Sequence, residues 1–324
     1  MSIAFDFVGT NVGSGTKTYN INFLKEIELL SLREDIIIFL TKNYFQQLKK
    51  KKQNPKIRYI VKSNFFSNIF FRLFWMQFIL PFELKINGVK KLYSPMNFCP
   101  IFLKIFKIKI ILTLHSNLPW VYFHLMPGNI LRNFFTKKLM ELSINSCNLL
   151  LVDSHFAKKE ITNILKINIK KIKVVYLGID KKFLSNDCKN NFIESFNYNE
   201  KYIVSVLSCV KYHNILNMLK AFKILVSDNN YDIKLVLVLQ ILDTEYFSEI
   251  NKYINTNFDK NKIIIINDVK SESLPNLYKH FQLYIFSSYC EVFGLTSLEA
   301  MSQGCPILIS NTSALPMRYM EKPQ

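Results

Sequence analysis

Short apolar segments alternate along the chain with stretches in which apolar residues recur at helical spacing. The first segment, residues 3–8, runs into Gly9, Gly13 and Gly15, and a helical pattern then continues to Ile27. This order predicts a strand, a glycine loop and a helix. Further buried strands are predicted at residues 35–40, 108–114, 149–153, 174–177, 202–207, 233–239, 262–266, 283–287 and 306–310. Strands that alternate with helices predict an α/β protein with parallel, doubly wound sheets.

Residues 65–80 form the most apolar stretch of the chain, but they include Asn68, Arg72 and Gln77. The stretch is too short and too polar to span a bilayer, which takes about 20 consecutive apolar residues. Because proline disrupts a helix interior, we predict a core or interfacial helix that ends before Pro81.

The length of 324 residues is enough for two domains, each with its own core. A polar, Asn-rich stretch at residues 181–201 has no clear periodicity and predicts the linker. We place an N-terminal domain at residues 1–185 and a C-terminal domain at residues 186–324.

The net charge of +18 is carried by the N-terminal part of the chain. Residues 1–190 hold 30 Lys and Arg against 11 Asp and Glu, a net +19, and residues 191–324 hold 12 against 13, a net −1. A basic, Phe-rich half fits attraction to anionic lipid at a membrane surface. A solvated lysine face without a partner is the alternative. The chain has no recognised nucleic-acid motif, so we expect no nucleic-acid partner.

The cysteines and the N-terminus indicate a cytoplasmic protein. The six cysteines are scattered, with no C-x-x-C pair and no histidine at zinc-ligand spacing, so we expect no metal. Residues 1–10 lack the charged and apolar regions of a signal peptide. Together with the basic half, this predicts a peripheral protein on the cytoplasmic face of the membrane.

The segment from Ser287 to Ser310 carries two glutamates separated by seven residues. Glu291 follows a predicted strand at the end where α/β sheets bind ligands. Gly294 allows close backbone approach, and a helix that starts near Thr296 directs its N–H groups at the same place. A diphosphate fits there, with Glu299 in the first helical turns as a second carboxylate. The alternative is that Glu299 only complements the helix dipole and that Glu291 is a loop carboxylate.

The whole segment, with E-x-F-G-L, L-E-A-M, Gly304 and Pro306, resembles the signature of family 4 (group 1) glycosyltransferases. The resemblance implies a retaining enzyme with the GT-B fold, in which two Rossmann-like domains face a cleft. It also implies that Glu291 faces the transferred sugar and Glu299 holds the ribose of the donor. The backbone around the helix start would bind sugar and phosphate, at Phe293, Gly294, Leu295 and Thr296.

Other segments extend the resemblance to most of the chain. Gly13, Ser14 and Gly15 resemble the family's N-terminal glycine loop, which borders the donor phosphates and the acceptor. Residues 75–81 and 93–97 resemble family segments of mainly architectural value, and we treat Ser154 as a helix N-cap. His115 resembles the histidine of the T-x-H motif, which contacts a sugar hydroxyl. An imidazole satisfied by backbone at a strand end is the alternative.

Residues 205–222 resemble the family's phosphate-clamp loop but depart from it at two positions. His213 stands where the family commonly has Lys, and Ser208 stands where it can have Arg. Both changes weaken the expected clamp on the leaving diphosphate, unless Lys211 reaches it or His213 is protonated beside the phosphates.

Residues 317–324 depart from the family pattern. Relatives continue after A-L-P with an E-V-x-G-x-A-A stretch and final helices. Reading from the third base of the Met317 codon, with an AGR codon for Arg318, restores that stretch. We therefore predict that a frameshift just after Pro316 truncated the gene.

The sequence thus predicts a metal- and cofactor-free retaining glycosyltransferase. We expect it to move a hexose-type sugar, mannosyl- or glucosyl-like, from a nucleoside-diphosphate sugar to a lipid-linked glycan or surface-polysaccharide intermediate. The alternative is a truncated, inactive relative that binds only nucleotide or membrane. The sugar, the base, the acceptor and the linkage are left open.

Overall fold

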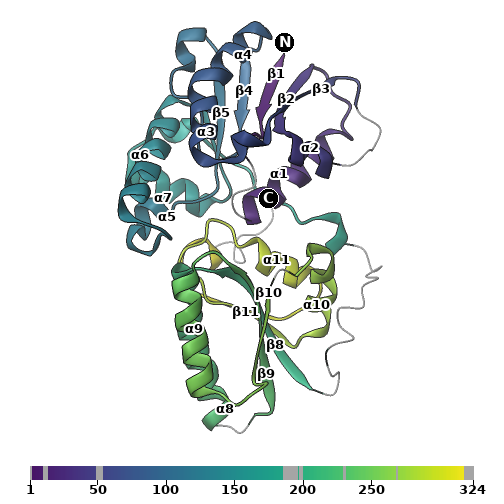
Figure 1. The fold of residues 1–324 in the computed structure, drawn as a ribbon, viewed down its shortest axis with the longest axis vertical. Helices are drawn as coiled ribbons and strands as arrows, with labels where there is room; N and C mark the ends of the chain where they lie inside the picture. The colour runs from purple at the N-terminus through teal and green to yellow at the C-terminus, as the bar shows by residue number, and fades with distance from the viewer. Residues whose placement is uncertain are drawn as a thin grey trace. The chain divides into compact units, whose positions relative to one another are not determined.

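A computed structural model of the chain describes residues 2–9, 14–48, 54–184, 196, 200–228, 231–267 and 269–316. Most of the predicted linker, Gly13 and residues 317–324 lie outside this set. The chain packs into two compact units (Figure 1). The first comprises Met1–Ser116 and Phe134–Tyr176, and the second comprises Asn117–Asn133 and Leu177–Gln324.

The first unit contains a fully parallel seven-stranded sheet with the order β3-β2-β1-β4-β5-β6-β7. The strands are β1 (Ile3–Asp6), β2 (Ile36–Thr41), β3 (Ile57–Lys62), β4 (Lys91–Ser94), β5 (Lys109–Leu114), β6 (Leu149–Val152) and β7 (Ile172–Val174). Every residue of β2 is buried, as expected of an inner strand with helices on both faces. The predicted doubly wound sheet is confirmed.

The helices of this unit cover both faces of the sheet. They are α1 (Ser14–Ile27), α2 (Lys42–Gln47), α3 (Ile69–Phe74), α4 (Leu80–Ile86), most of α6 (Ile130–Ser146) and α7 (His155–Leu165). Right-handed crossovers require the helices that follow β1 and β2 to lie on one face. Since the chain then moves across the sheet in the opposite direction from β3 to β7, the later helices lie on the other face.

The prediction that the helix ends before Pro81 is wrong. A 3₁₀ turn (Asn64–Ser67) is followed by Asn68, whose extended backbone caps α3, and α3, a wide π turn (Trp75–Ile79) and α4 then continue without interruption. Pro81 lies in the first turn of α4, where its missing N–H is tolerated next to the wide turn. Gln77 accounts for one polar position, because its amide bonds Cys99 O and Ile101 N. No helix among the described residues is long and apolar enough to cross a membrane.

The second unit contains a parallel five-stranded sheet with the order β10-β9-β8-β11-β12. Its strands are β8 (Lys201–Cys209), β9 (Ile233–Ile241), β10 (Ile263–Asn267), β11 (Leu283–Phe286) and β12 (Ile307–Ile309). Its helices are α5 (Leu118–Val121), α8 (Ile215–Asp228), α9 (Thr244–Asn257), α10 (Leu274–His280) and α11 (Leu295–Ser302). All five predicted strands are present, and their buried side chains form one core.

Candidate active site

The second unit has a topological switch point between β8 and β11. From β8 the chain moves through β9 to the edge strand β10, and it returns to the opposite side of β8 at β11. The loops that leave β8 and β11 therefore diverge at the carboxyl edge of the sheet, and α8 and α11 begin there. Open α/β sheets bind ligands at such points. The predicted donor residues lie at the end of β8, along these two loops and in α11.

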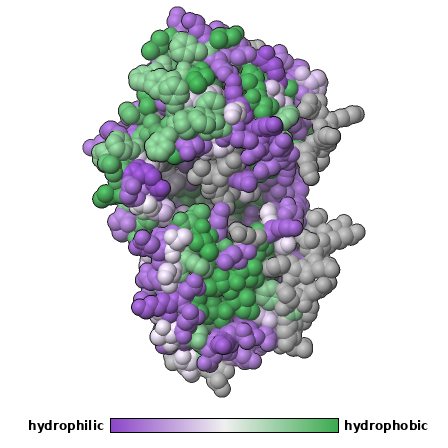
Figure 2. Space-filling view, viewed as in Figure 1, coloured by the Kyte–Doolittle hydropathy of each residue, from purple (hydrophilic) through white to green (hydrophobic). Residues whose placement is uncertain are grey.

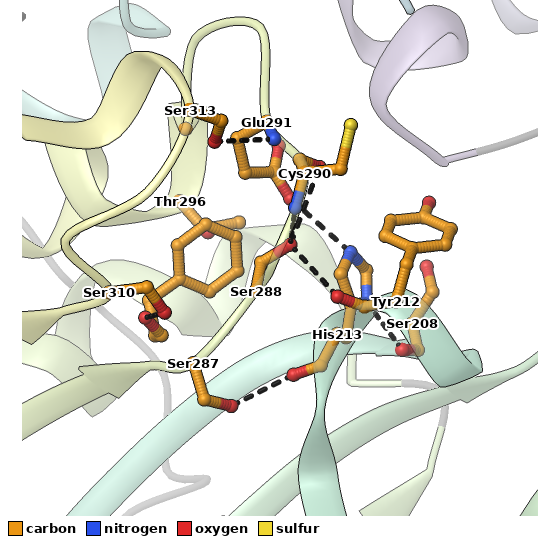
Figure 3. A network of polar contacts seen from close by, with 12 residues as sticks. Ser208, Tyr212, His213, Ser287, Ser288, Cys290, Glu291, Thr296, Ser310 and Ser313 are labelled. Atoms are coloured by element: carbon orange, nitrogen blue, oxygen red, sulfur yellow. Dashed lines mark hydrogen bonds and ion pairs between the residues drawn. The ribbon is translucent and has the colours of Figure 1, made fainter. Parts of the chain in front are cut away.

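Hydrogen bonds join the two loops to each other (Figure 3). Ser287 Oγ donates to His213 O at 2.8 Å. The backbone N–H of Tyr289 donates to Tyr212 O at 2.8 Å. The turn Lys211–His213 is thereby fixed against the loop that carries Glu291.

His213 is buried between two acceptors, as Figure 3 shows. Its Nδ1 lies 2.6 Å from Ser208 O, and its Nε2 lies 3.4 Å from Glu291 Oε1. A carbonyl oxygen can only accept, so Nδ1 carries a proton. A second proton on Nε2 would turn the contact with Glu291 into an ion pair. The structure thus brings together three predicted site residues, whereas the Lys211 side chain is exposed.

Glu291 is held by the segment that follows β12. Its backbone N–H donates to Ser313 Oγ at 2.9 Å, and Ala314 N donates to Glu291 O at 3.2 Å. Its carboxylate is partly buried, and its Oε1 lies 3.4 Å from His213 Nε2. The carboxylate can therefore accept hydrogen bonds from a ligand hydroxyl.

Gly294 immediately precedes α11 in a left-handed conformation with φ of +78°. A Cβ atom at this position would lie 2.5 Å from Leu315 Cδ2, so only glycine fits. Ser297 Oγ donates to Gly294 O at 2.6 Å, and Thr296 Oγ1 accepts from Tyr284 OH at 2.7 Å. With Phe293 buried and Leu295 partly buried, α11 starts from a rigid loop.

Glu299 lies in α11 and is 6% exposed. Burial raises the pKa of its carboxyl to about 7, Lys182 opposes the rise, and Asp180 adds to it. The group therefore exists in both protonation states near neutral pH. In either state it has an oxygen that can accept a hydrogen bond from a ribose hydroxyl.

In the first unit, His115 follows β5 and forms a pair with Asp153, which follows β6. His115 Nδ1 lies 2.9 Å from Asp153 Oδ2, and both side chains are buried. A carboxylate only accepts, so the proton resides on Nδ1 and leaves Nε2 as the acceptor nitrogen. Nε2 is buried and has no hydrogen-bond partner in the described part of the chain. Asn97 fixes the backbone, because its Oδ1 accepts from His115 N at 2.7 Å.

Two tyrosines lie next to this pair. The Tyr19 ring centroid is 4.6 Å from that of His115, and Tyr19 OH is 2.7 Å from Tyr93 OH. Tyr93 OH in turn lies 2.9 Å from Thr113 Oγ1. Burial raises the pKa of both tyrosines, so both remain neutral hydrogen-bonding groups.

Sequence reasoning did not assign a role to Asp153, Asn97 or Tyr93. The available signal was their position, because each lies at or just after the carboxyl end of β4 or β6, which flank β5 in the sheet. The predicted N-cap role of Ser154 is confirmed by its contact with Ala157 N at 3.1 Å.

The predicted glycine loop is described only in part. Gly13 lies outside the described residues, Ser14 begins α1, and a Cβ at Gly15 would meet no atom within 4 Å. The glycine that the structure requires is Gly9, with φ of +76° and an added Cβ 2.4 Å from Arg72 Cδ.

Residues 187–321 match the family described as "Glycosyl transferases group 1". The chain is 22% identical over 200 residues to the O-antigen chain mannosyltransferase RfbU of Salmonella typhimurium. This alignment covers 62% of this chain and 51% of that protein. It is 27% identical over 190 residues to the capsular polysaccharide biosynthesis glycosyltransferase CapM of Staphylococcus aureus, which covers 56% and 48%. The alignments therefore span about half the length of these curated relatives.

Solved structures share the fold over nearly the whole chain. Anabaena Alr3699/HepE, in complex with UDP and glucose, gives a TM-score of 0.72 at 15% identity and covers 99% of this chain and 83% of that one. WaaG, described as a glycosyltransferase involved in lipopolysaccharide biosynthesis, gives 0.67 at 12% identity and covers 97% and 82%. The chain has the GT-B fold. With the family match, this supports a group 1 glycosyltransferase.

Proposed function

We propose that the chain is a retaining glycosyltransferase that moves a hexose, mannosyl- or glucosyl-like, from a nucleoside-diphosphate sugar to a lipid-linked glycan or surface-polysaccharide intermediate. The observation that carries the proposal is the switch point of the second unit, where His213, Glu291 and the start of α11 share one edge of the sheet. The group 1 match covers this edge. The O-antigen and capsular relatives support the class of acceptor.

In the proposed donor complex, the diphosphate lies at the start of α11, where backbone N–H groups and the helix dipole favour an anion. Protonated His213 adds a positive charge in place of the lysine expected from the resemblance. Glu291 accepts hydrogen bonds from the sugar, and Glu299 accepts from the ribose. No metal takes part in this proposal.

The reaction would break the bond between the sugar C1 and the diphosphate oxygen and form a bond between C1 and an acceptor hydroxyl oxygen. The acceptor's proton passes to the departing phosphate oxygen on the same face of the sugar, so the configuration is retained. No side chain acts as a nucleophile. The protein stabilises the charge that develops on the diphosphate, a contribution that is often the largest in such sites.

His115 is proposed to contact a hydroxyl of the transferred sugar. Its Nε2 is the nitrogen that can accept, because Asp153 holds the proton on Nδ1. Asp153 is then a positioning residue, which fixes the ring and its tautomer without touching the substrate. We further propose that the enzyme works at the cytoplasmic surface of a membrane, where a lipid-linked acceptor is present.

Transfer tests the proposal directly. The full chain is incubated with radiolabelled UDP-, GDP- and ADP-sugars and with membranes that contain lipid-linked glycans, and label is counted in the lipid fraction. Glu299→Ala should mainly raise the donor KM, and Glu291→Ala should mainly lower kcat. Unchanged rates in both variants would refute the site assignment. Nucleotide binding by the wild type without any transfer would support the inactive relative instead.

A further inference from the structure

A stripe of exposed apolar side chains runs along the continuous helical segment of residues 69–86. Phe70, Phe74, Phe78, Phe82 and Ile86 recur at every fourth position, and their exposed fractions range from 55% for Phe74 to 83% for Ile86. Residues four apart lie on one side of a helix. Single exposed apolar residues are common, but a contiguous stripe of five large ones marks an interaction surface.

The opposite side of the same helix is buried in the core. Trp75, Met76 and Leu80 are completely buried. The segment is therefore apolar on both sides, a pattern typical of a helix in contact with apolar material all around. In this unit the sheet supplies that material on only one side.

The stripe continues onto the turn before β5. Phe102 and Ile105 are exposed there, and the Phe82 and Phe106 rings are in contact with centroids 5.8 Å apart. In Figure 2, apolar atoms gather over α3 and α4 of the first unit. Helix α6, which the crossover rule places on the same face of the sheet, adds exposed Phe134 and Phe135.

The charge around the stripe is almost entirely positive. Residues 61–141 contain 11 Lys and Arg and two acidic residues, Glu83 and Glu141, which are paired with Lys62 and Lys138. Lys85, Lys104 and Lys107 are exposed among the apolar residues, and Lys85 Nζ lies 5.5 Å from the centroid of the Phe106 ring. The surface therefore combines exposed aromatic rings with exposed lysines.

We infer that this face of the first unit docks on an anionic lipid bilayer, with the Phe stripe in the acyl boundary and the lysines among the headgroups. An interfacial helix binds through buried apolar area together with attraction to anionic lipid. A second copy of the chain would match the apolar stripe, but a symmetric interface would bring like charges together. The inference rests on this surface alone and holds whether or not the chain transfers sugar.

Co-sedimentation with vesicles tests the inference. The full chain is mixed with vesicles of phosphatidylcholine alone or of phosphatidylcholine and phosphatidylglycerol in equal amounts. The wild type should pellet with the anionic vesicles and bind the neutral ones at least about tenfold more weakly. Combining Phe70→Ser, Phe74→Ser and Phe78→Ser should lower partitioning by about a hundredfold. Lys104→Gln with Lys107→Gln should lower it by about tenfold on anionic vesicles only.

Matched controls use exposed residues of the second unit. Ile224→Ser, Leu242→Ser and Met301→Ser together, and Lys201→Gln with Lys260→Gln, should leave partitioning unchanged. Unchanged melting temperatures would show that the Phe variants fold. A wild type that stays in the supernatant with anionic vesicles would overturn the inference, as would equal losses in the controls. A wild-type dimer in solution that the triple Phe variant converts to monomer would assign the stripe to a second copy instead.

Discussion

His213 Nε2 lies 3.4 Å from Glu291 Oε1, while Nδ1 of the same ring lies 2.6 Å from Ser208 O. The two predicted departures from the family pattern, at positions 208 and 213, are thus parts of one arrangement. The position 208 residue supplies a carbonyl that orients the imidazole, and Glu291 Oε1 lies next to the other ring nitrogen. His213 thereby stands at the position where the resemblance places a lysine of the phosphate clamp.

This arrangement predicts that His213 contributes to transfer, because its ring is held at the edge of the sheet where the diphosphate is proposed to bind. His213→Gln keeps a polar side chain but cannot become a cation, so it should be about tenfold to a hundredfold slower than the wild type. His213→Lys supplies a cation and should keep more of the activity. The measurement is kcat/KM for each variant.

The surface variant His155→Ala is the control, since that ring is exposed and outside the proposed site. It should reproduce the wild-type kcat/KM. A His213→Gln variant with the wild-type kcat/KM would show that His213 does not supply the charge.

The buried carboxyl of Glu299 should have opposite effects on stability and on nucleotide binding: its ionised form lowers the stability of the fold, but its carboxylate favours binding. Its pKa is raised from 4.5 to about 7 in the folded chain, mainly by burial, so the folded state holds the proton more tightly than the unfolded state. Stability therefore falls as the pH rises from about 4.5 to 7, and the full penalty of about 3 kcal/mol persists at higher pH. Glu299→Gln stays neutral and should raise the melting temperature by several degrees at about pH 8.

The same variant should bind nucleoside diphosphate more weakly, because the carboxylate acceptor is lost. Below about pH 4.5 the two proteins should melt at similar temperatures, since both side chains are neutral there. Thermal unfolding at the two pH values measures the difference in melting temperature between the variant and the wild type and checks its sign. A variant that is less stable than the wild type at about pH 8 would contradict the raised pKa of Glu299.

Replacing Asp153 should lower turnover without changing donor affinity. In Asp153→Asn the amide can donate to His115 Nδ1, which moves the imidazole proton to Nε2 and removes the acceptor nitrogen. We expect kcat to fall by about tenfold to a hundredfold with little change in the donor KM. Asp259→Asn, at an exposed position, is the matched control. Equal changes in kcat and in KM would point to a purely structural role.

Replacing Gly294 should destabilise the fold through a steric clash as well as backbone strain, and Gly304 serves as the comparison in which only backbone strain acts. Gly294 and Gly304 both have positive φ, but an added Cβ meets Leu315 Cδ2 at 2.5 Å in the first and no atom within 4 Å in the second. Gly304→Ala should cost about 1 kcal/mol from backbone strain alone, and Gly294→Ala about 2–3 kcal/mol. Chemical unfolding measures both. Equal costs would show that the loop before α11 relaxes around the new methyl group.

The strand pattern predicted both sheets well, because inner parallel strands are continuous apolar runs bounded by polar turns. The exceptions are β3 and β4, which the strand pattern did not predict. β3 is an edge strand with a single buried residue, and β4 is only four residues long. The helical segment of residues 69–86 was cut short in the prediction, because a π turn that accommodates Pro81 leaves no local signature in the sequence.

The sequence predicted those site residues that lie together in one segment of the chain, but not the contacts between segments. Glu291, Gly294 and Glu299 lie within one strand, loop and helix, so their spacing is visible in the sequence. The contact of His213 with Ser208 and Glu291 depends on the adjacency of β8 and β11, and that of His115 with Asp153 depends on β5 and β6. Strand order is a property of tertiary packing, which local spacing does not encode.

The central claim is that a nucleoside diphosphate binds at the switch point between β8 and β11. Calorimetric titration of the full chain with UDP, GDP and ADP tests it most directly. At least one of the three should bind, and Glu299→Ala and His213→Ala should each weaken that binding at least about tenfold, while Asp259→Asn leaves it unchanged. Failure of all three nucleotides to bind, or equal affinity in the wild type and both site variants, would contradict the account.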